Sequence, residues 1–291
     1  MAAQNNQHAP AVGHTVSRLI KLCRVDNPAL DVTELRTALD GVVAGIEVVE
    51  ATGSTNADLI AAAAAGAPDR TVLVAELQNT GRGRLGRQWT SPPGAGLTFS
   101  VLLRPTEVPP PRLGWLPLLA GLSLVRTVRQ LTTLDAALKW PNDLLVGPRG
   151  AKCAGLLAEV AGPGAVVLGI GLNVRTAAAE LPEGVNATSL LAEGADLRRT
   201  ELLVALLRRL LADEAAWRSS GGDPDAVGLR EDYRAACATI GSPVRIEQPG
   251  GTSTVATAMD VDAHGRLLIL DEQGTTRPIA AGDVVHLRAI P

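Results

Sequence analysis

Hydrophobic residues along the chain follow two spacings, one typical of strands and one typical of helices. Short apolar runs bounded by glycine, proline or polar residues predict strands. Longer segments with apolar residues three or four positions apart predict helices. Strands are expected at residues 45–50, 71–76, 97–103, 137–146 (two strands around a tight turn), 152–160 and 166–174. Helices are expected at 31–40, from 52–56 to about 66, and at 115–131, 199–217 and 225–236.

The pattern changes at residue 241, where strands become short and turns frequent. Short strands are expected at 244–247, 254–261, 266–270, 275–279 and 284–287. About 50 residues of this kind predict a small all-β barrel, which is marginal in size unless it docks on a neighbour. The chain is therefore expected to hold a mobile polar tail at 1–30, a large domain at 31–240 and a barrel at 241–291.

The composition excludes several classes of protein. A net charge of −3 argues against a general nucleic-acid binder, which would be basic. The cysteines Cys23, Cys153 and Cys237 lie far apart, without the spacing of a zinc site or a disulfide framework, which favours a reducing cytoplasm. The first residues do not resemble a signal peptide, and no apolar run approaches the roughly 18 residues of a membrane span.

Lysine is rare in this chain. Of the 27 basic residues, three are lysines: Lys21, Lys139 and Lys152. Because arginine supplies positive charge elsewhere, a lysine in an apolar strand indicates a need for a compact ammonium group. Alternation along the strand at 152–160 predicts that Lys152, Ala154 and Leu156 share one face. Cys153 and Gly155 are then expected on the opposite face.

A segment rich in glycine and arginine, residues 80–89, suits the interior of neither a helix nor a strand. It holds three glycines and three arginines in seven residues and ends at Trp89. Glycine lets backbone N–H groups approach a ligand, and arginine side chains suit phosphate or carboxylate. The segment predicts a mobile loop that closes over an anion. A solvated basic loop, or one that binds RNA loosely, is the alternative at this point.

Polar clusters follow two of the predicted strands. Residues 54–56 open a helix, so they are either an N-cap or contacts to a small ligand. Asn142 and Asp143 belong to a Pro-Asn-Asp corner, which fits turn chemistry as well as ligand binding. The Gly-x-Gly at 169–171 is not a dinucleotide fingerprint, because no third glycine opens a helix after it.

Four segments together resemble the signature segments of biotin protein ligases. They are residues 81–89, 139–143, 152–159 and 169–174, and residues 53–56 precede them. They occur in the order and spacing of that family, and the resemblance covers about residues 42–287. It implies an α+β fold: a catalytic domain of the class II aminoacyl-tRNA-synthetase-like, biotin–lipoate ligase type, with a mixed sheet and helices, followed by a C-terminal SH3-like β-barrel.

The chain departs from the family pattern in two places. Leu85 stands where members often carry a polar or basic residue, which we expect to change loop dynamics but not the chemistry. The residues before Val42 are too few and too polar to build the N-terminal winged helix of the bifunctional ligase-repressors. DNA binding is therefore not expected.

The resemblance implies a reaction in two steps. The carboxylate of biotin attacks the α-phosphate of ATP and gives biotinyl-5′-adenylate and pyrophosphate. A lysine on the biotin carboxyl carrier domain of a biotin-dependent carboxylase then attacks this anhydride. The first step brings two anions together, so neutralisation and alignment are the main catalytic needs. Mg²⁺ is expected on the triphosphate, and no membrane partner is expected.

The resemblance also implies three overlapping sets of residues, with no metal ligand assigned. The catalytic residues are Lys152, Arg84 and Asp143. The biotin-binding residues are Ser54, Thr55, Asn56, Gln78, Gly81, Arg82, Gly83, Arg84, Lys152, Gly155 and Leu156. The residues that bind ATP or the adenylate are Arg82, Arg84, Arg87, Trp89, Asn142, Lys152 and Asn173.

Several alternatives stay open from the sequence. Trp89 either walls the pocket or anchors the loop in the core. Asp143 could orient Lys152, bind a metal or help to deprotonate the incoming lysine. Lipoate ligation is the second candidate function, together with octanoyl transfer by Cys153, although Cys153 is expected in the core. An RNA-binding module is disfavoured by the acidic balance and the few aromatic residues.

Overall fold

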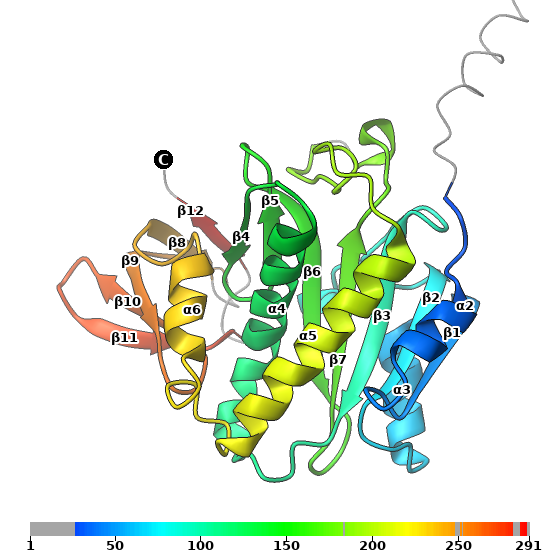
Figure 1. Ribbon diagram of the computed structural model, residues 1–291. Helices are drawn as coiled ribbons and strands as arrows, with labels where there is room; N and C mark the ends of the chain where they lie inside the picture. Colours follow the sequence, from blue (N-terminus) through cyan, green and yellow to red (C-terminus); the bar gives the residue numbers. More distant parts are fainter. Residues whose placement is uncertain (1–26, 183, 248–250, 252, 282–285, 290–291) are drawn as a thin grey trace, which may run out of the picture.

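The computed structural model describes residues 27–182, 184–247, 251, 253–281 and the backbone of 286–289. Its centre is a seven-stranded sheet in the order β1-β2-β3-β7-β6-β5-β4 (Figure 1). Strands β1 and β2 pair parallel and the other neighbours pair antiparallel, so the predicted mixed sheet is confirmed. The strands are β1 (Gly45–Thr52), β2 (Thr71–Gln78), β3 (Gly96–Leu103), β4 (Ala136–Lys139), β5 (Asp143–Val146), β6 (Ala151–Val160) and β7 (Val166–Asn173).

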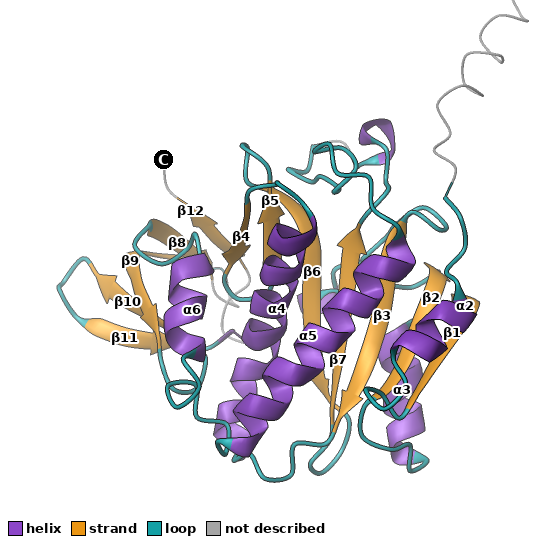
Figure 2. Ribbon diagram, in the orientation of Figure 1, coloured by secondary structure: helices purple, strands orange, loops and turns teal. Residues whose placement is uncertain are grey.

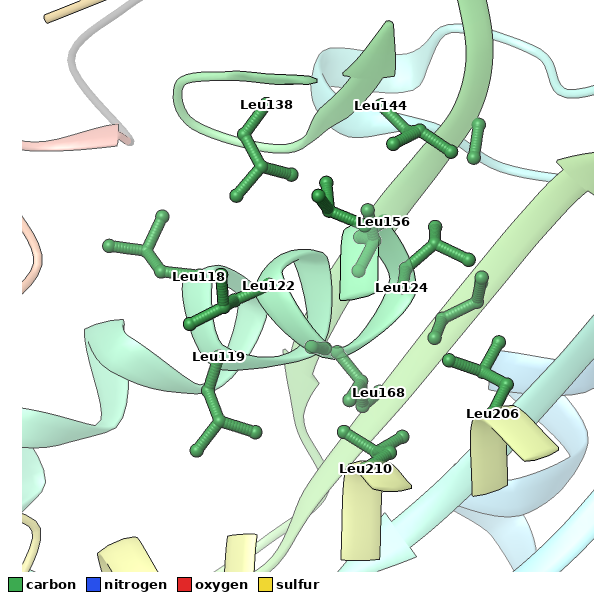
Figure 3. Close-up of a cluster of buried hydrophobic side chains, with 14 of the residues drawn as sticks. Leu118, Leu119, Leu122, Leu124, Leu138, Leu144, Leu156, Leu168, Leu206 and Leu210 are labelled. Carbon is green, nitrogen blue, oxygen red and sulfur yellow. The ribbon is translucent and has the colours of Figure 1, made fainter. Parts of the chain in front are cut away.

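Helices cover both faces of this sheet (Figure 2). The larger core lies between the sheet and the helices α4 (Leu116–Leu131) and α5 (Arg199–Ser219), which cross its front in Figure 1. Leucines of both helices meet leucines of the sheet there (Figure 3). Helix α3 (Thr55–Ala64) packs on the other face, where Leu59 meets Leu102. Helix α2 (Val32–Ala38) contacts α5 and β1.

The residues of strand β3 show that one face of the sheet packs against the core and the other carries polar side chains. All its residues are buried, but they divide by alternation. Leu97, Phe99 and Val101 belong to the core beneath α4 and α5. Thr98 and Ser100 therefore point to the opposite face, where the sheet leaves room for a polar site.

Two parts of the chain depart clearly from the sequence predictions. Helix α6 (Leu229–Ala236) begins four residues later than expected, because Gly228 precedes it in the left-handed region at φ 69°. Residues 27–30, expected in the tail, pack on the large domain. Leu30 is buried and its N–H donates to Glu76, and Arg199 donates to the carbonyl of Pro28. The other domain boundaries stay predictions.

The C-terminal residues form a five-stranded antiparallel sheet in the order β11-β10-β9-β8-β12, of the expected SH3-like type. Strand β12 covers the second half of the strand expected at 284–287, whose first two residues lie outside the described part. The sequence also predicts a turn at 248–251, between the first two short strands, and it lies largely outside the described part as well. The strands are β8 (Pro243–Glu247), β9 (Ser253–Val261), β10 (Leu267–Asp271), β11 (Thr276–Ile279) and β12 (His286–Ala289).

Two tryptophans of the large domain hold this small domain. The indole N–H of Trp115 donates to the carbonyl of Asp262 at 3.1 Å, and that of Trp140 donates to Gly265 at 3.2 Å. Both rings are fully buried, and both bonds go to the turn between β9 and β10. A Cβ at Gly114 would lie 2.3 Å from the carbonyl oxygen of His264, so glycine is needed for this contact. In the described part of the chain, no helix is long and apolar enough to span a membrane.

We expect Gly114→Ala to loosen the small domain. The added methyl would displace the backbone of the turn that both tryptophans bind, at a cost of about 1–3 kcal/mol in the free energy of unfolding. Urea unfolding measures this. Gly45→Ala is the control, because a Cβ there meets nothing within 4 Å. Equal stability of the two variants would show that the turn does not depend on this close approach.

Candidate active site

A cavity of about 110 Å³ lies on the face of the sheet opposite α4 and α5. Its floor is built from paired strand residues. Gly155 on β6 pairs with Gly171 on β7, which pairs with Thr98 on β3. In the next row outward, Gly169 pairs with Ser100. Glycine and small polar residues in adjacent rows leave a hollow in a sheet that is otherwise covered.

The hollow is occupied in part by Trp89. A Cβ at Gly171 would lie 2.4 Å from Cε2 of the Trp89 ring, and one at Gly155 would lie 3.5 Å from Cζ3. The ring therefore lies flat against these two glycines. Trp89 is half-buried and lines the cavity, so the interpretation as a pocket wall is favoured over a core anchor.

The prediction for the faces of β6 was wrong. A Cβ at Gly155 would lie 3.4 Å from Nζ of Lys152, so Lys152 and Gly155 share the cavity side. The cause is a bulge: Leu144 pairs with Ala154 but Leu145 pairs with Lys152, which leaves Cys153 without a partner on β5. The extra residue shifts the alternation by one.

Lys152 forms an ion pair with Asp143 across this bulge. Its Nζ lies 2.6 Å from Oδ1 of Asp143 and 6.0 Å from the centre of the Trp89 ring. Neighbouring Cys153 is fully buried, and its thiol donates to the carbonyl of Asn173. Burial, and then the charge of Glu193, raises the pKa of the Cys153 thiol far above its ordinary value. Cys153 is therefore a core residue and not a nucleophile, as the sequence indicated.

The polar residues after β1 form a network behind the cavity. Ser54 caps α3 by accepting from the N–H of Ala57, so the N-cap interpretation is confirmed for its side chain. The N–H of Thr55 donates to Oε1 of Gln78 at 2.7 Å. These side chains line the cavity as well, so capping and ligand contact do not exclude each other.

Two residues of this network were missed by the sequence analysis. Ser100 is fully buried and donates to Oδ1 of Asn56 at 2.6 Å. The amide of Asn56 donates in turn to Oε2 of Glu159 at 2.7 Å. Ser100 on β3 and Glu159 on β6 are far from Asn56 in the sequence. Ser100 lies outside every segment singled out there, and Glu159 ends the segment 152–159 without an assigned role.

The glycine–arginine loop is folded into a small hairpin. The N–H of Gly83 donates to Arg87 at 2.7 Å, and that of Trp89 donates to Gly81 at 3.0 Å. A Cβ at Gly81 would lie 2.4 Å from the carbonyl oxygen of Trp89, which requires glycine there. Leu85, at the tip, is exposed and adopts φ 56°.

Arg84 connects this loop to both domains. Its guanidinium donates to Oδ1 of Asn142 at 3.4 Å and to the carbonyl oxygen of Ala281 in the small domain. Burial lowers the pKa of Arg84, and the nearby carboxylate of Asp143 opposes this shift. The side chain of Asn142 also donates to the carbonyl of Leu156 at 2.9 Å, so Asn142 holds its own turn and meets the loop.

A second cavity adjoins the first at Lys152 and Trp89, which line both. Asn173 faces it, and its amide donates to the carbonyl of Thr188. The segment after β7, including Glu180 and Val185, closes its outer side and was not singled out from the sequence.

The structure brings most of the predicted site residues together. Gly81 lies outside the lining of the first cavity, and Asn173 lines the second cavity. No group of three or more histidine, cysteine or acidic side chains suited to a metal occurs among the described residues. The predicted residues that line the first cavity are Ser54, Thr55, Asn56, Gln78, Arg82, Gly83, Arg84, Arg87, Trp89, Asn142, Asp143, Lys152, Gly155 and Leu156.

Comparisons with known proteins agree with this geometry. Residues 48–176 match the model of the Biotin/lipoate A/B protein ligase family, and residues 239–287 match the Biotin protein ligase C terminal domain. The fold and its cavity thus define a protein of the biotin/lipoate ligase class.

Individual relatives show which members of the biotin/lipoate ligase class this chain resembles. Biotin--[acetyl-CoA-carboxylase] ligase of Mycobacterium tuberculosis is 48% identical over 269 residues, covering 90% of this chain and 97% of the relative. The bifunctional ligase/repressor BirA of Escherichia coli is 29% identical, covering 94% of this chain and 81% of BirA. The biotin protein ligase of Aquifex aeolicus in complex with biotin and ATP superposes with a TM-score of 0.70 at 30% identity, covering 85% of this chain and all of that one. The chain belongs to the biotin protein ligase family.

We expect Gly171→Ala to displace Trp89 from the glycine floor. A methyl group there overlaps the indole, and overpacking of this kind costs about 1–3 kcal/mol. The dissociation constant for biotin should rise by about tenfold or more, measured by calorimetry, while Gly45→Ala should bind as the parent does. Unchanged affinity in Gly171→Ala would mean that biotin binds without Trp89 against the floor.

Proposed function

We propose that this chain makes biotinyl-5′-AMP from biotin and ATP and transfers the biotin to a lysine of a biotin carboxyl carrier domain. The observation that carries the proposal is the position of Lys152, which lines both cavities and pairs with Asp143. One ammonium group at this junction can neutralise an acid held in one cavity and a phosphate held in the other. Two anions must meet there for the first step to occur.

The first cavity is proposed to hold biotin. The ureido ring of biotin has two N–H donors and one carbonyl acceptor, and all three need partners when buried. Thr55, Asn56 and Gln78 supply such partners. Ser100 donates to Thr55 and Asn56, Asn56 donates to Glu159, and Gln78 accepts from Thr55, so all three side chains are fixed by hydrogen bonds. A fixed polar network suits a urea better than the apolar ring of lipoate or the chain of octanoate.

The second cavity is proposed to hold the adenylate, with Asn173 and Trp89 facing the nucleotide. The biotin carboxylate attacks the α-phosphorus, and pyrophosphate leaves. Arg84 and Lys152 are placed to bear the charge that develops. Arg84 lines the first cavity, as do Arg82 and Arg87, and Lys152 lines both cavities. Asp143 is proposed to orient Lys152, which its 2.6 Å ion pair supports.

In the second step the amine of the carrier lysine attacks the acyl carbonyl and AMP leaves. Lys152 is proposed to polarise that carbonyl, and the amine gives up a proton as the amide forms. Cys153 has no part in either step, because it is buried in the core. Octanoyl transfer through a cysteine is therefore not favoured.

Mg²⁺ is proposed to arrive with the triphosphate. This ion needs one or two carboxylates at most, because phosphates and water complete its shell. Asp143 is the one carboxylate among the described residues that line the first cavity. The residues present fit such an ion, which would neutralise phosphate charge when bound.

The carrier domain is proposed to belong to an acetyl-CoA carboxylase, and the protein is proposed to act in the cytoplasm. The name of the relative from Mycobacterium tuberculosis suggests that the carrier domain belongs to an acetyl-CoA carboxylase. Cys153 and Cys237 are buried thiols, as expected in the cytoplasm. That the chain does not bind DNA remains a prediction.

We expect Lys152→Ala to lower the rate of biotin-dependent ATP–pyrophosphate exchange by about 10²–10³, because one preorganised charge is lost from the transition state. The parent enzyme should exchange with biotin but not with lipoate or octanoate. Circular dichroism checks that the variant folds. Near-parent exchange in Lys152→Ala would remove Lys152 from the mechanism, and exchange with lipoate would overturn the substrate.

We expect Arg84→Ala to make the adenylate but lose it to solvent, because the loop is no longer held to Asn142 and Ala281. Free adenylate should accumulate, and lysines of a bystander protein should become biotinylated. Arg129→Ala is the control, since Arg129 also donates to a backbone carbonyl, that of Ala136, away from the site. Equal retention in both variants would argue against a loop that seals the intermediate.

A further inference from the structure

The main chain of Lys152 is held by a segment that lies outside the central sheet. Its N–H donates to the carbonyl of Asn186 at 2.9 Å, and its carbonyl accepts from the N–H of Thr188 at 2.9 Å. Ala187 thereby forms an isolated parallel bridge with Lys152. The bridge lies next to the bulge at Cys153, where pairing with β5 is disrupted. Residues 186–188 therefore supply main-chain bonds to β6 beside the bulge.

Glu193 fixes this segment. The hydroxyl of Thr188 donates to Oε1 of Glu193 at 2.6 Å, and Thr188 is 1% exposed. A Cβ at Gly147 would lie 2.1 Å from Oε2 of Glu193, so the carboxylate lies against the turn that follows β5. The Glu193 N–H donates to the carbonyl of Ser189, which closes the segment on itself. A short bond from a hydroxyl to a carboxylate is among the stronger hydrogen bonds in proteins.

The same segment reaches the second cavity. The carbonyl of Thr188 accepts from the amide of Asn173 at 3.0 Å, and Asn173 faces that cavity. Val185 and Ala187 line it as well. A ligand that fills the second cavity therefore touches the segment that holds Lys152.

We propose that Glu193 is a positioning residue for Lys152 and acts through Thr188. It also couples a filled nucleotide cavity to the placement of the lysine ammonium. This inference rests on the proposed function, because it assigns a role within the same adenylation step. Neither Glu193 nor Thr188 lines the biotin cavity among the described residues, so binding of biotin should not depend on them. A shift of about 1 Å in a reacting group can cost about 10²-fold in rate.

The first test removes the hydrogen bond between Thr188 and Glu193 by changing each partner in turn. Glu193→Ala and Thr188→Val should each lower kcat for biotin-dependent ATP–pyrophosphate exchange by about 10- to 10²-fold, with KM for biotin unchanged. Glu193→Gln and Thr188→Ser keep an acceptor and a donor and should recover most of the rate. Ser123→Ala is the matched control, because it breaks a hydroxyl–carboxylate bond from buried Ser123 to Asp213, and neither residue lines the two cavities.

The second test asks whether Glu193 acts through Lys152. In the Lys152→Ala background, Glu193→Ala should change the remaining single-turnover rate by less than about twofold, since coupled residues are not additive. The proposal would be overturned if Glu193→Ala lowered the rate by the same factor in the parent and in Lys152→Ala. It would also be overturned if Glu193→Ala raised KM for biotin as it lowered kcat. If Glu193→Ala does not fold, the near-isosteric Thr188→Val serves in its place. A parent without exchange activity would refute the proposed function, whereas an active parent and fully active variants would refute this inference alone.

Discussion

The site depends on a single interruption in the pairing of β6 with β5. Without the bulge at Cys153, strict alternation would place Lys152 and Gly155 on opposite faces of the sheet. The extra residue turns the ammonium of Lys152 toward the glycine floor and Trp89. It also lets Cys153 and Ala154, consecutive residues, both be buried in the core. The ion pair with Asp143 and the junction between the two cavities follow from this one local change.

The sequence predicted the elements well, because most strands are apolar runs with clear ends and the long helices have clear periodicity. It failed where a single backbone conformation decides the outcome. Gly228 at positive φ delays α6, and the bulge in β6 leaves no mark in a pattern of apolar residues. Glycines on neighbouring strands, Gly155 and Gly171, could have suggested a hollow, but their pairing is known only once the register of the sheet is known.

Candidate site residues were found where a motif is local and missed where contacts span the chain. The loop at 80–89 and the residues at 54–56 stand out by composition alone. Ser100, Glu159 and Glu193 do not, because each acts by holding another side chain that a distant segment supplies. A single serine or glutamate in a strand or loop is common in proteins and does not by itself indicate a functional site. Its role can be assigned only when its hydrogen-bond partner is known.

The contact between Arg84 and Ala281 has a consequence for the order in which the protein matures. Arg84 in the loop is translated 197 residues before Ala281, whose carbonyl accepts its hydrogen bond. A chain still on the ribosome can complete the glycine floor and the lysine before it can fasten the loop. On the proposed mechanism, the reactive intermediate is therefore enclosed only after the small domain has docked on the large one.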